Sequence, residues 1–221
     1  MDLFDLIGPV MVGPSSSHTA GAARIGLTAR MLLGEDVVQA EIAFHGSFAK
    51  TYQGHGTDRA LVGGLMGMQV DDLRLRESLT LAREAGIVIS FQQVNIRGAH
   101  PNTVQMTITG RSGRQLMMEA ASVGGGNIEI RRIDGMNVAF TGKENTLVIQ
   151  NTDAPGAIAA VTGALAEMDI NIASMQVYRR QAGADAMMVL ELDGQLSDED
   201  VKIIQNIRQV RGCTFLKRRN G

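Results

Sequence analysis

The chain has 221 residues, of which 44% are hydrophobic and 20% are charged, the proportions of an ordinary soluble globular protein. Its net charge of −2 excludes the basic footprint that nucleic acid or an anionic membrane surface requires, so we expect neither partner. The single cysteine excludes an internal disulfide framework, and no apolar run approaches the length of a membrane span. The segment Met1–Asp5 lacks the basic start of a secretory signal. These features predict a cytoplasmic protein.

Hydrophobic periodicity predicts helices followed by strands in the first part of the chain. Helices are expected over 19–33, 57–68 and 73–85, and the first is preceded by N-capping serines and ended by Gly34. Strands are expected over 37–48, 87–96, 103–109, 115–123 and 128–133. Helices first and mostly antiparallel strands afterwards predict an α+β domain over residues 1–140.

The segment 139–145 is the predicted domain boundary, because it is polar, holds a glycine and separates two different patterns. After it, strands are predicted at 145–151, 171–180, 184–192 and 212–217, with helices at 156–168 and 198–207. This βαββαβ order is that of a ferredoxin-like domain, expected over residues 145–221. Ser197 has the right spacing from Asp200 to cap the second helix.

The turn at 151–156 of this module reads Asn-Thr-Asp-Ala-Pro-Gly. Free backbone N–H groups at the following helix start could hold a ligand carboxylate, and a simple strand-to-helix turn is the alternative. Together with Asp-Ile-Asn-Ile at 169–172, the turn resembles the ACT domain signature. ACT domains pair side by side and often bind amino acids near this turn and across the pair, although some only dimerise. The resemblance implies self-association and an effector site made of Asn151, Asp153, Gly156, Asn171 and Ile172.

Two histidine-containing segments lie at predicted helix starts in the first domain. Gly-Pro-Ser-Ser-Ser-His-Thr at 13–19 places hydroxyls and an imidazole where helix N–H groups suit a carboxylate or phosphate. Gly-His-Gly-Thr-Asp at 54–58 exposes His55 between two glycines, and an imidazole can move protons near neutrality. A serine-rich N-cap with a surface histidine, and a turn followed by an N-cap, are the structural alternatives.

Two further segments combine turn residues with polar side chains. His-Pro-Asn-Thr at 100–103 could donate hydrogen bonds, although most such turns are structural. Ser-Val-Gly-Gly-Gly at 122–126 could cradle an anion, but it lacks the form of a phosphate loop and a flexible hairpin is the simpler interpretation. Four widely separated histidines and one cysteine show no tight ligand spacing, so we expect no metal bound by this chain alone.

These segments, in this order and with His-Gly-Ser at 45–47, resemble the beta chain of iron–sulfur L-serine dehydratases. The resemblance spans about residues 2–136. It implies an alpha chain, or a fused domain, whose cysteines hold a [4Fe–4S] cluster, and conversion of L-serine to pyruvate and ammonia without pyridoxal phosphate. One cysteine cannot hold such a cluster, so the residues independently require a partner chain.

Removing water from serine needs an acid to help the β-hydroxyl leave and a base to take the α-proton. An open iron of the cluster can serve as the Lewis acid. The resemblance implies catalytic roles for His18, His55, Thr57 and Asp58, and which histidine is the base stays open. It implies substrate binding by a set of hydroxyl and amide residues, namely Ser15, Ser16, Ser17, Thr19, Asn102 and Thr103.

The first domain is also similar to an extra regulatory domain of some phosphoglycerate dehydrogenases, which likewise precedes an ACT domain. That resemblance implies a non-catalytic module in which the same clusters bind an effector phosphate or carboxylate. The chain has no GxGxxG unit for a dinucleotide, so it is not itself such a dehydrogenase. A purely structural scaffold is the third alternative.

Overall fold

A computed structural model describes residues 12–13 and 15–218, and the chain divides into two compact units, Met1–Gly135 and Met136–Gly221. The division lies a few residues before the predicted boundary segment. Pro14 of the first motif and the Met1–Asp5 segment lie outside the described residues. Within the described part, no helix is long and apolar enough to cross a membrane. The predicted α+β class is confirmed.

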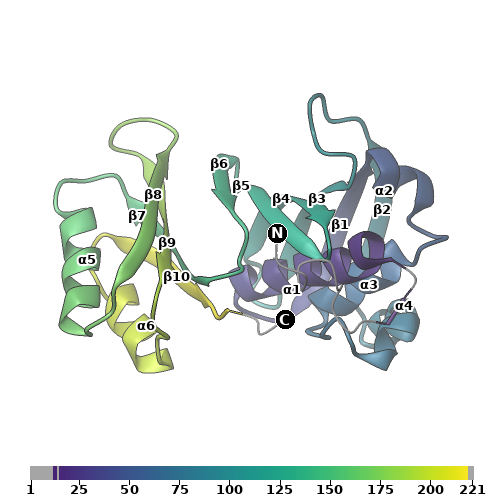
Figure 1. Cartoon of the computed structure of the whole chain (residues 1–221), viewed down its shortest axis with the longest axis horizontal. Helices are drawn as coiled ribbons and strands as arrows, with labels where there is room; N and C mark the ends of the chain where they lie inside the picture. The colour runs from purple at the N-terminus through teal and green to yellow at the C-terminus, as the bar shows by residue number, and fades with distance from the viewer. Residues whose placement is uncertain (1–11, 14, 219–221) are drawn as a thin grey trace. The chain divides into compact units, whose positions relative to one another are not determined.

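A six-stranded sheet with the order β2-β1-β3-β4-β5-β6 organises the first domain (Figure 1). β1 and β2 are parallel and are joined by a helical crossover, whereas β3 pairs antiparallel with both β1 and β4, and β4 pairs antiparallel with β5. The strands are β1 Val37–His45, β2 Val88–Val94, β3 Thr103–Gly110, β4 Gln115–Gly124, β5 Asn127–Ile133 and, just after the division at Gly135, β6 Met136–Phe140.

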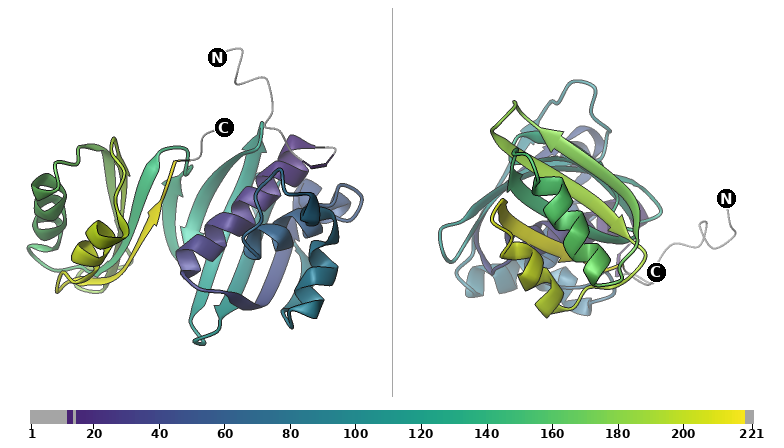
Figure 2. Two further views of the ribbon diagram at one scale, coloured as in Figure 1. Left: turned by 90° about the horizontal axis from the view of Figure 1, so that it is seen from below. Right: turned by 90° about the vertical axis from the view of Figure 1, so that its left-hand side faces the viewer.

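The helices of the first domain include a π-helix, η2, that runs directly into α1, and α1 lies along the sheet (Figure 2). α1 packs against α3 through glycines: a Cβ on Gly26 would lie 2.1 Å from the carbonyl oxygen of Leu61, and a Cβ on Gly64 would lie 2.1 Å from that of Ala23. The two helices therefore touch backbone to backbone. The helices are η2 Ser16–Gly21, α1 Ala22–Leu33, α2 Gly46–Thr51, α3 Thr57–Leu65, the 3₁₀ helix η3 Leu73–Glu77 and α4 Ser78–Glu84.

The sequence predictions for this domain need three corrections. The strand predicted over 37–48 ends at His45, because Gly46 has a φ of +60° and α2 begins there. A Cβ at Gly46 would lie 2.5 Å from the carbonyl oxygen of Pro101, so only glycine fits this position. The helix predicted over 73–85 is a 3₁₀ turn followed by α4, and β6 was not predicted.

The second unit contains the predicted ferredoxin-like domain. Its sheet has the order β10-β7-β9-β8, with antiparallel neighbours throughout, and α5 and α6 pack with its core (Figure 1). The hydroxyl of Ser197 accepts from the backbone N–H of Asp200, and the Asp200 carboxylate accepts from that of Ser197, which confirms the predicted cap. The elements are β7 Asn145–Thr152, α5 Ala157–Glu167, β8 Ile172–Arg179, β9 Asp185–Leu192, α6 Asp198–Gln205 and β10 Val210–Leu216.

Candidate functional site

The five polar segments of the first domain meet, although they are far apart in the sequence. Thr19 in η2 donates its hydroxyl hydrogen to the backbone carbonyl of His55, with 3.4 Å between the oxygens. His18 Nε2 lies 3.3 Å from the hydroxyl oxygen of Ser47, whose backbone N–H donates to the Pro101 carbonyl at 2.7 Å. These contacts connect the segments 13–19, 45–47, 54–58 and 100–103 into one site.

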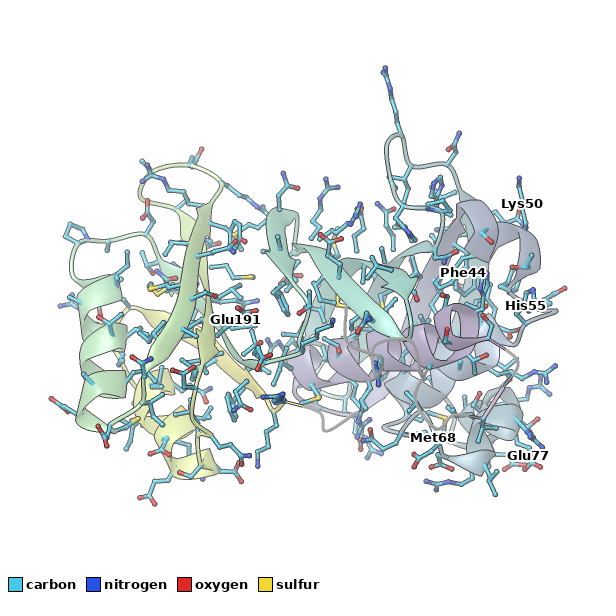
Figure 3. The ribbon with its side chains drawn as sticks, in the orientation of Figure 1. Phe44, Lys50, His55, Met68, Glu77 and Glu191 are labelled. Carbon is cyan, nitrogen blue, oxygen red and sulfur yellow. The ribbon has the colours of Figure 1, made fainter. Side chains whose placement is uncertain are left out.

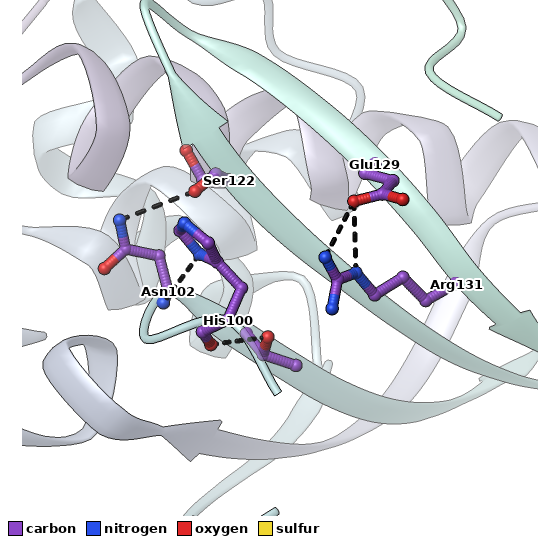
Figure 4. A network of polar contacts seen from close by, with 6 residues as sticks. His100, Asn102, Ser122, Glu129 and Arg131 are labelled. Carbon is purple, nitrogen blue, oxygen red and sulfur yellow. Dashed lines mark hydrogen bonds and ion pairs between the residues drawn. The ribbon is translucent and has the colours of Figure 1, made fainter. Parts of the chain in front are cut away.

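The fifth segment, residues 122–126, is connected to the site by Asn102, as Figure 4 shows for Ser122. The Asn102 side-chain amide donates to the Ser122 carbonyl at 3.5 Å, and its backbone N–H donates to His100 Nδ1 at 3.1 Å. Thr103 is buried and donates its hydroxyl to the His100 carbonyl at 2.7 Å. The His-Pro-Asn-Thr turn thus satisfies many of its own polar groups, and substrate binding by Asn102 and Thr103 remains a prediction.

His18 and His55 differ sharply in their surroundings, although their ring centroids lie 4.9 Å apart. His18 is held by the hydroxyls of Ser15 and Ser47 and by the edge of Phe48, whose ring centroid is 5.2 Å away. Burial lowers the pKa of His18 below its usual value, and the nearby His55 acts in the same direction, so His18 is neutral at neutral pH. The His18 imidazole is a fixed group.

His55 is exposed, and its ring has no hydrogen-bond partner among the described residues. Figure 3 shows it at the same outer edge of the domain as Lys50. Gly56, which follows it, has a φ of +68° and no atom within 4 Å of the position that a Cβ would take, so the turn leaves the imidazole accessible. The His55 imidazole is therefore accessible to a molecule bound beside it.

A cleft of about 700 Å³ lies beside His55, and His18 is not among the described residues that line it. Thr19 and His55 line it together with two cationic side chains, Arg59 and Arg76. Two guanidinium groups beside an imidazole and a hydroxyl make this cleft suited to an anionic ligand such as a carboxylate.

Thr57 and Asp58 are buried at the start of α3, and neither is among the described residues that line the cleft. The Thr57 hydroxyl has no hydrogen-bond partner in the described part of the chain. Burial raises the pKa of Asp58, although its carboxylate accepts the backbone N–H of Arg59 at 2.8 Å, which opposes the shift. Direct catalytic roles for these two side chains remain predictions.

The predicted effector residues fall at two opposite ends of the ferredoxin-like sheet. Asp153 accepts hydrogen bonds from the Gly183 backbone N–H and from Arg179 Nη1, each at 3.0 Å, and these bonds lower its pKa. Gly156 caps α5 with a φ of +85°. At the other end, Ile172 pairs with Leu192 and follows Asn171.

The polar groups of this effector set are mostly engaged within the domain. The Asn171 side-chain amide donates to Asp193 at 2.6 Å, and that of Asn151 donates to the Thr152 carbonyl at 2.9 Å. The carbonyl oxygen of the Asn151 side chain is buried and has no hydrogen-bond partner among the described residues. An unpaired buried acceptor of this kind has unused capacity for a ligand donor.

Comparison with known proteins decides the family. The serine dehydratase beta chain family matches residues 1–86, and the ACT domain family matches residues 145–208. A probable L-serine dehydratase beta chain of Bacillus subtilis is 41% identical over 94% of this chain and 96% of its own length. The chain belongs to the L-serine dehydratase beta-chain family. The beta chain of Peptoniphilus asaccharolyticus L-serine dehydratase is 37% identical over 97% of both chains.

A more distant relative of this beta chain is the D-3-phosphoglycerate dehydrogenase of Bacillus subtilis, 29% identical over 86% of the chain but only 36% of the dehydrogenase. Both resemblances seen in the sequence are therefore found, and the beta-chain family is the stronger. Sequence reasoning missed three residues at the site, Ser47, Arg59 and Arg76. Ser47 could have been predicted, because it is the last residue of the His-Gly-Ser segment that carries part of the family resemblance.

Proposed function

We propose that this beta chain forms an L-serine dehydratase with an alpha chain, and that the pair converts L-serine to pyruvate and ammonia in the cytoplasm. The observation that carries the proposal is the meeting of five separate polar segments around the His18–His55 pair. The names of the bacterial relatives support it, because a beta chain implies an alpha chain.

The donor groups of this chain do not fit a [4Fe–4S] cluster, so we assign the cluster ligands to the alpha chain. The only cysteine in the sequence is Cys213, on β10 of the second unit, and burial raises the pKa of its thiol to about 12. A thiol that resists ionisation is a poor metal ligand. In the described part of the chain, no three His, Cys, Asp or Glu side chains converge to hold a metal.

Within this chain, the proposal gives proton transfer to His55 and substrate positioning to the hydroxyl groups around it. His55 is accessible and lies beside the cleft, where it would take the α-proton of serine. Thr19 and the serines at 15–17 lie at the start of the helix that carries His18 and would bind the substrate carboxylate. The fixed and neutral His18 would support His55 without adding a competing positive charge.

The test is reconstitution with the anaerobically prepared alpha chain, followed by pyruvate formation. The beta chain alone should not deaminate serine, and adding the alpha chain should restore turnover. His55→Ala should lower kcat by about 10²- to 10⁴-fold, the usual contribution of a general acid or base. Ser17→Ala and Thr19→Val should mainly raise KM, as groups that bind substrate would.

His100→Ala is the matched control, because its Nδ1 accepts the Asn102 backbone N–H within the turn and its imidazole has a structural partner. It should affect turnover much less than His55→Ala. Near-full activity of His55→Ala in the assembled enzyme would exclude the proposed proton transfer. Serine turnover by the beta chain alone would contradict the requirement for an alpha chain.

We further propose that the ACT domain binds an amino acid, with L-serine as the first candidate, between two copies of this chain. The split of the effector residues supports this arrangement: Asp153 and Gly156 lie at one end of the sheet and Asn171 at the other. A second, antiparallel copy that extends the sheet would bring residues at its opposite ends close together. Sedimentation equilibrium should therefore show tighter self-association with millimolar L-serine, and an unchanged equilibrium with every amino acid tested would leave only a dimerisation role.

A second function, binding of a regulatory anion without catalysis, is favoured by Arg59 and Arg76 in the cleft and by the phosphoglycerate dehydrogenase relative. Calorimetry with inorganic phosphate on the beta chain separates the two. Phosphate binding that Arg59→Gln abolishes, with no turnover after alpha-chain reconstitution, would favour this second function.

A further inference from the structure

Ser47 is held in place by its backbone, independently of its side chain. Its N–H donates to the Pro101 carbonyl at 2.7 Å, and its carbonyl accepts the Thr51 hydroxyl at 2.8 Å. The preceding Gly46 adopts a φ of +60° against Pro101, a position that no residue with a Cβ can share. The Ser47 hydroxyl is thus presented to His18 Nε2 from a rigid support, at 3.3 Å.

The other ring nitrogen of His18 has its own hydroxyl partner. Ser15 Oγ accepts the backbone N–H of His18 at 3.2 Å, and it also lies 3.4 Å from His18 Nδ1. A serine hydroxyl has one hydrogen to donate, and this hydrogen finds an acceptor in Nδ1 only if Nδ1 carries no proton. In a part-buried site an unpaired donor is costly, so Ser15 favours the neutral imidazole with its proton on Nε2.

We infer that Ser47 is a positioning residue that accepts a hydrogen bond from His18 Nε2 and, together with Ser15, holds His18 as the Nε2–H tautomer. The two hydroxyls clamp the ring at opposite nitrogens, and Phe48 limits its rotation from the side. The ring that faces His55 at 4.9 Å is thereby fixed in both orientation and proton position. Its effect on catalysis rests on the proposed function, whereas the tautomer does not.

Nitrogen-15 NMR of the histidine-labelled full chain tests the tautomer without any activity measurement. Long-range ¹H–¹⁵N spectra distinguish a protonated from an unprotonated ring nitrogen, and His18→Gln identifies the His18 signals. We expect wild-type His18 to show a protonated Nε2 and an unprotonated Nδ1. Ser47→Ala should move the two nitrogen shifts toward each other, because the Nε2–H loses its acceptor and the tautomers mix.

Ser47→Thr keeps the hydroxyl and should restore the wild-type pattern, and the exposed Ser90→Ala on β2 is the matched control that should leave the pattern unchanged. Circular dichroism verifies that each variant is folded, and if Ser47→Ala does not fold, the wild-type and Ser47→Thr spectra still decide the tautomer. A protonated Nδ1 in the wild type would overturn the inference. So would a Ser47→Ala spectrum identical to the wild type.

In the reconstituted enzyme, Ser47→Ala should lower kcat by about 2- to 10-fold with little change in KM, the scale of one hydrogen bond. Ser47→Thr should recover most of this loss. If the NMR result holds but kcat does not change, the tautomer assignment stands and the proposed role of His18 in turnover fails.

Discussion

Gly64→Ala should separate α1 from α3 and thereby disturb the histidine pair that these helices support. The added methyl carbon would lie 2.1 Å from the Ala23 carbonyl oxygen, where an ordinary contact is beyond about 3.4 Å. The obstacle is backbone, and the neighbouring Leu27 backbone nitrogen lies at 2.7 Å, so no side chain can rotate away. The helices must move apart by about 1 Å.

Two opposing effects set the size of the change. Overpacking a close contact costs about 1–3 kcal/mol, and more when rigid backbone must move. The alanine recovers up to about 1 kcal/mol in helix propensity. We therefore expect a net loss of about 2 kcal/mol, which corresponds to a roughly 30-fold rise in the population of the locally opened state.

Hydrogen exchange followed by mass spectrometry on peptides from α1 and α3 measures this change directly, because exchange through local opening reports the opening free energy. Gly163→Ala is the matched control: Gly163 lies in α5 with no atom within 4 Å of its would-be Cβ, so the same change should slow exchange there. Unchanged or slower exchange of α1 and α3 in Gly64→Ala would refute the packing argument. The displacement should also widen the 4.9 Å gap between His18 and His55 and lower turnover in the assembled enzyme.

Three other predictions use single positions. Gly156→Val should abolish any L-serine-dependent shift in sedimentation, because a β-branched residue is strained at a φ of +85°; an undiminished shift would remove Gly156 from the effector site. Burial raises the pKa of Asp58, so the folded state binds this proton more tightly, and stability should fall as the pH rises from below 3.8 through the raised value. Asp58→Asn should flatten that decline in urea midpoints from about pH 3 to about pH 7, and an unchanged slope would contradict the shift. Cys213, with a thiol pKa of about 12, should react with iodoacetamide far more slowly in the folded chain than in urea at mildly alkaline pH, and equal rates would show that it is not shielded.

Local patterns in the sequence were sufficient for most of the secondary structure. The first long helix ends at Gly34 as predicted, with a left-handed cap, and the order of the second unit follows from periodicity and the Ser197–Asp200 cap. These features depend on residues within a few positions of one another, so they can be predicted from the local sequence. Gly46 could not be predicted in this way. The local pattern makes it one more residue of a strand, and its turn depends on Pro101, 55 positions later, which packs against it.

The sequence by itself also determined the candidate residues, because each polar segment is recognisable alone and their order identifies the family. Only the tertiary structure decided which of these residues are buried, which are exposed and which are held by hydrogen bonds. It holds His18 between two hydroxyls, leaves His55 exposed, buries Thr57 and Asp58, and adds Ser47 to the site. It also places Asp153 and Asn171 at opposite ends of one sheet. The physical reason is that burial and hydrogen-bond partners arise from contacts between distant segments, and no local pattern records which segment will supply them.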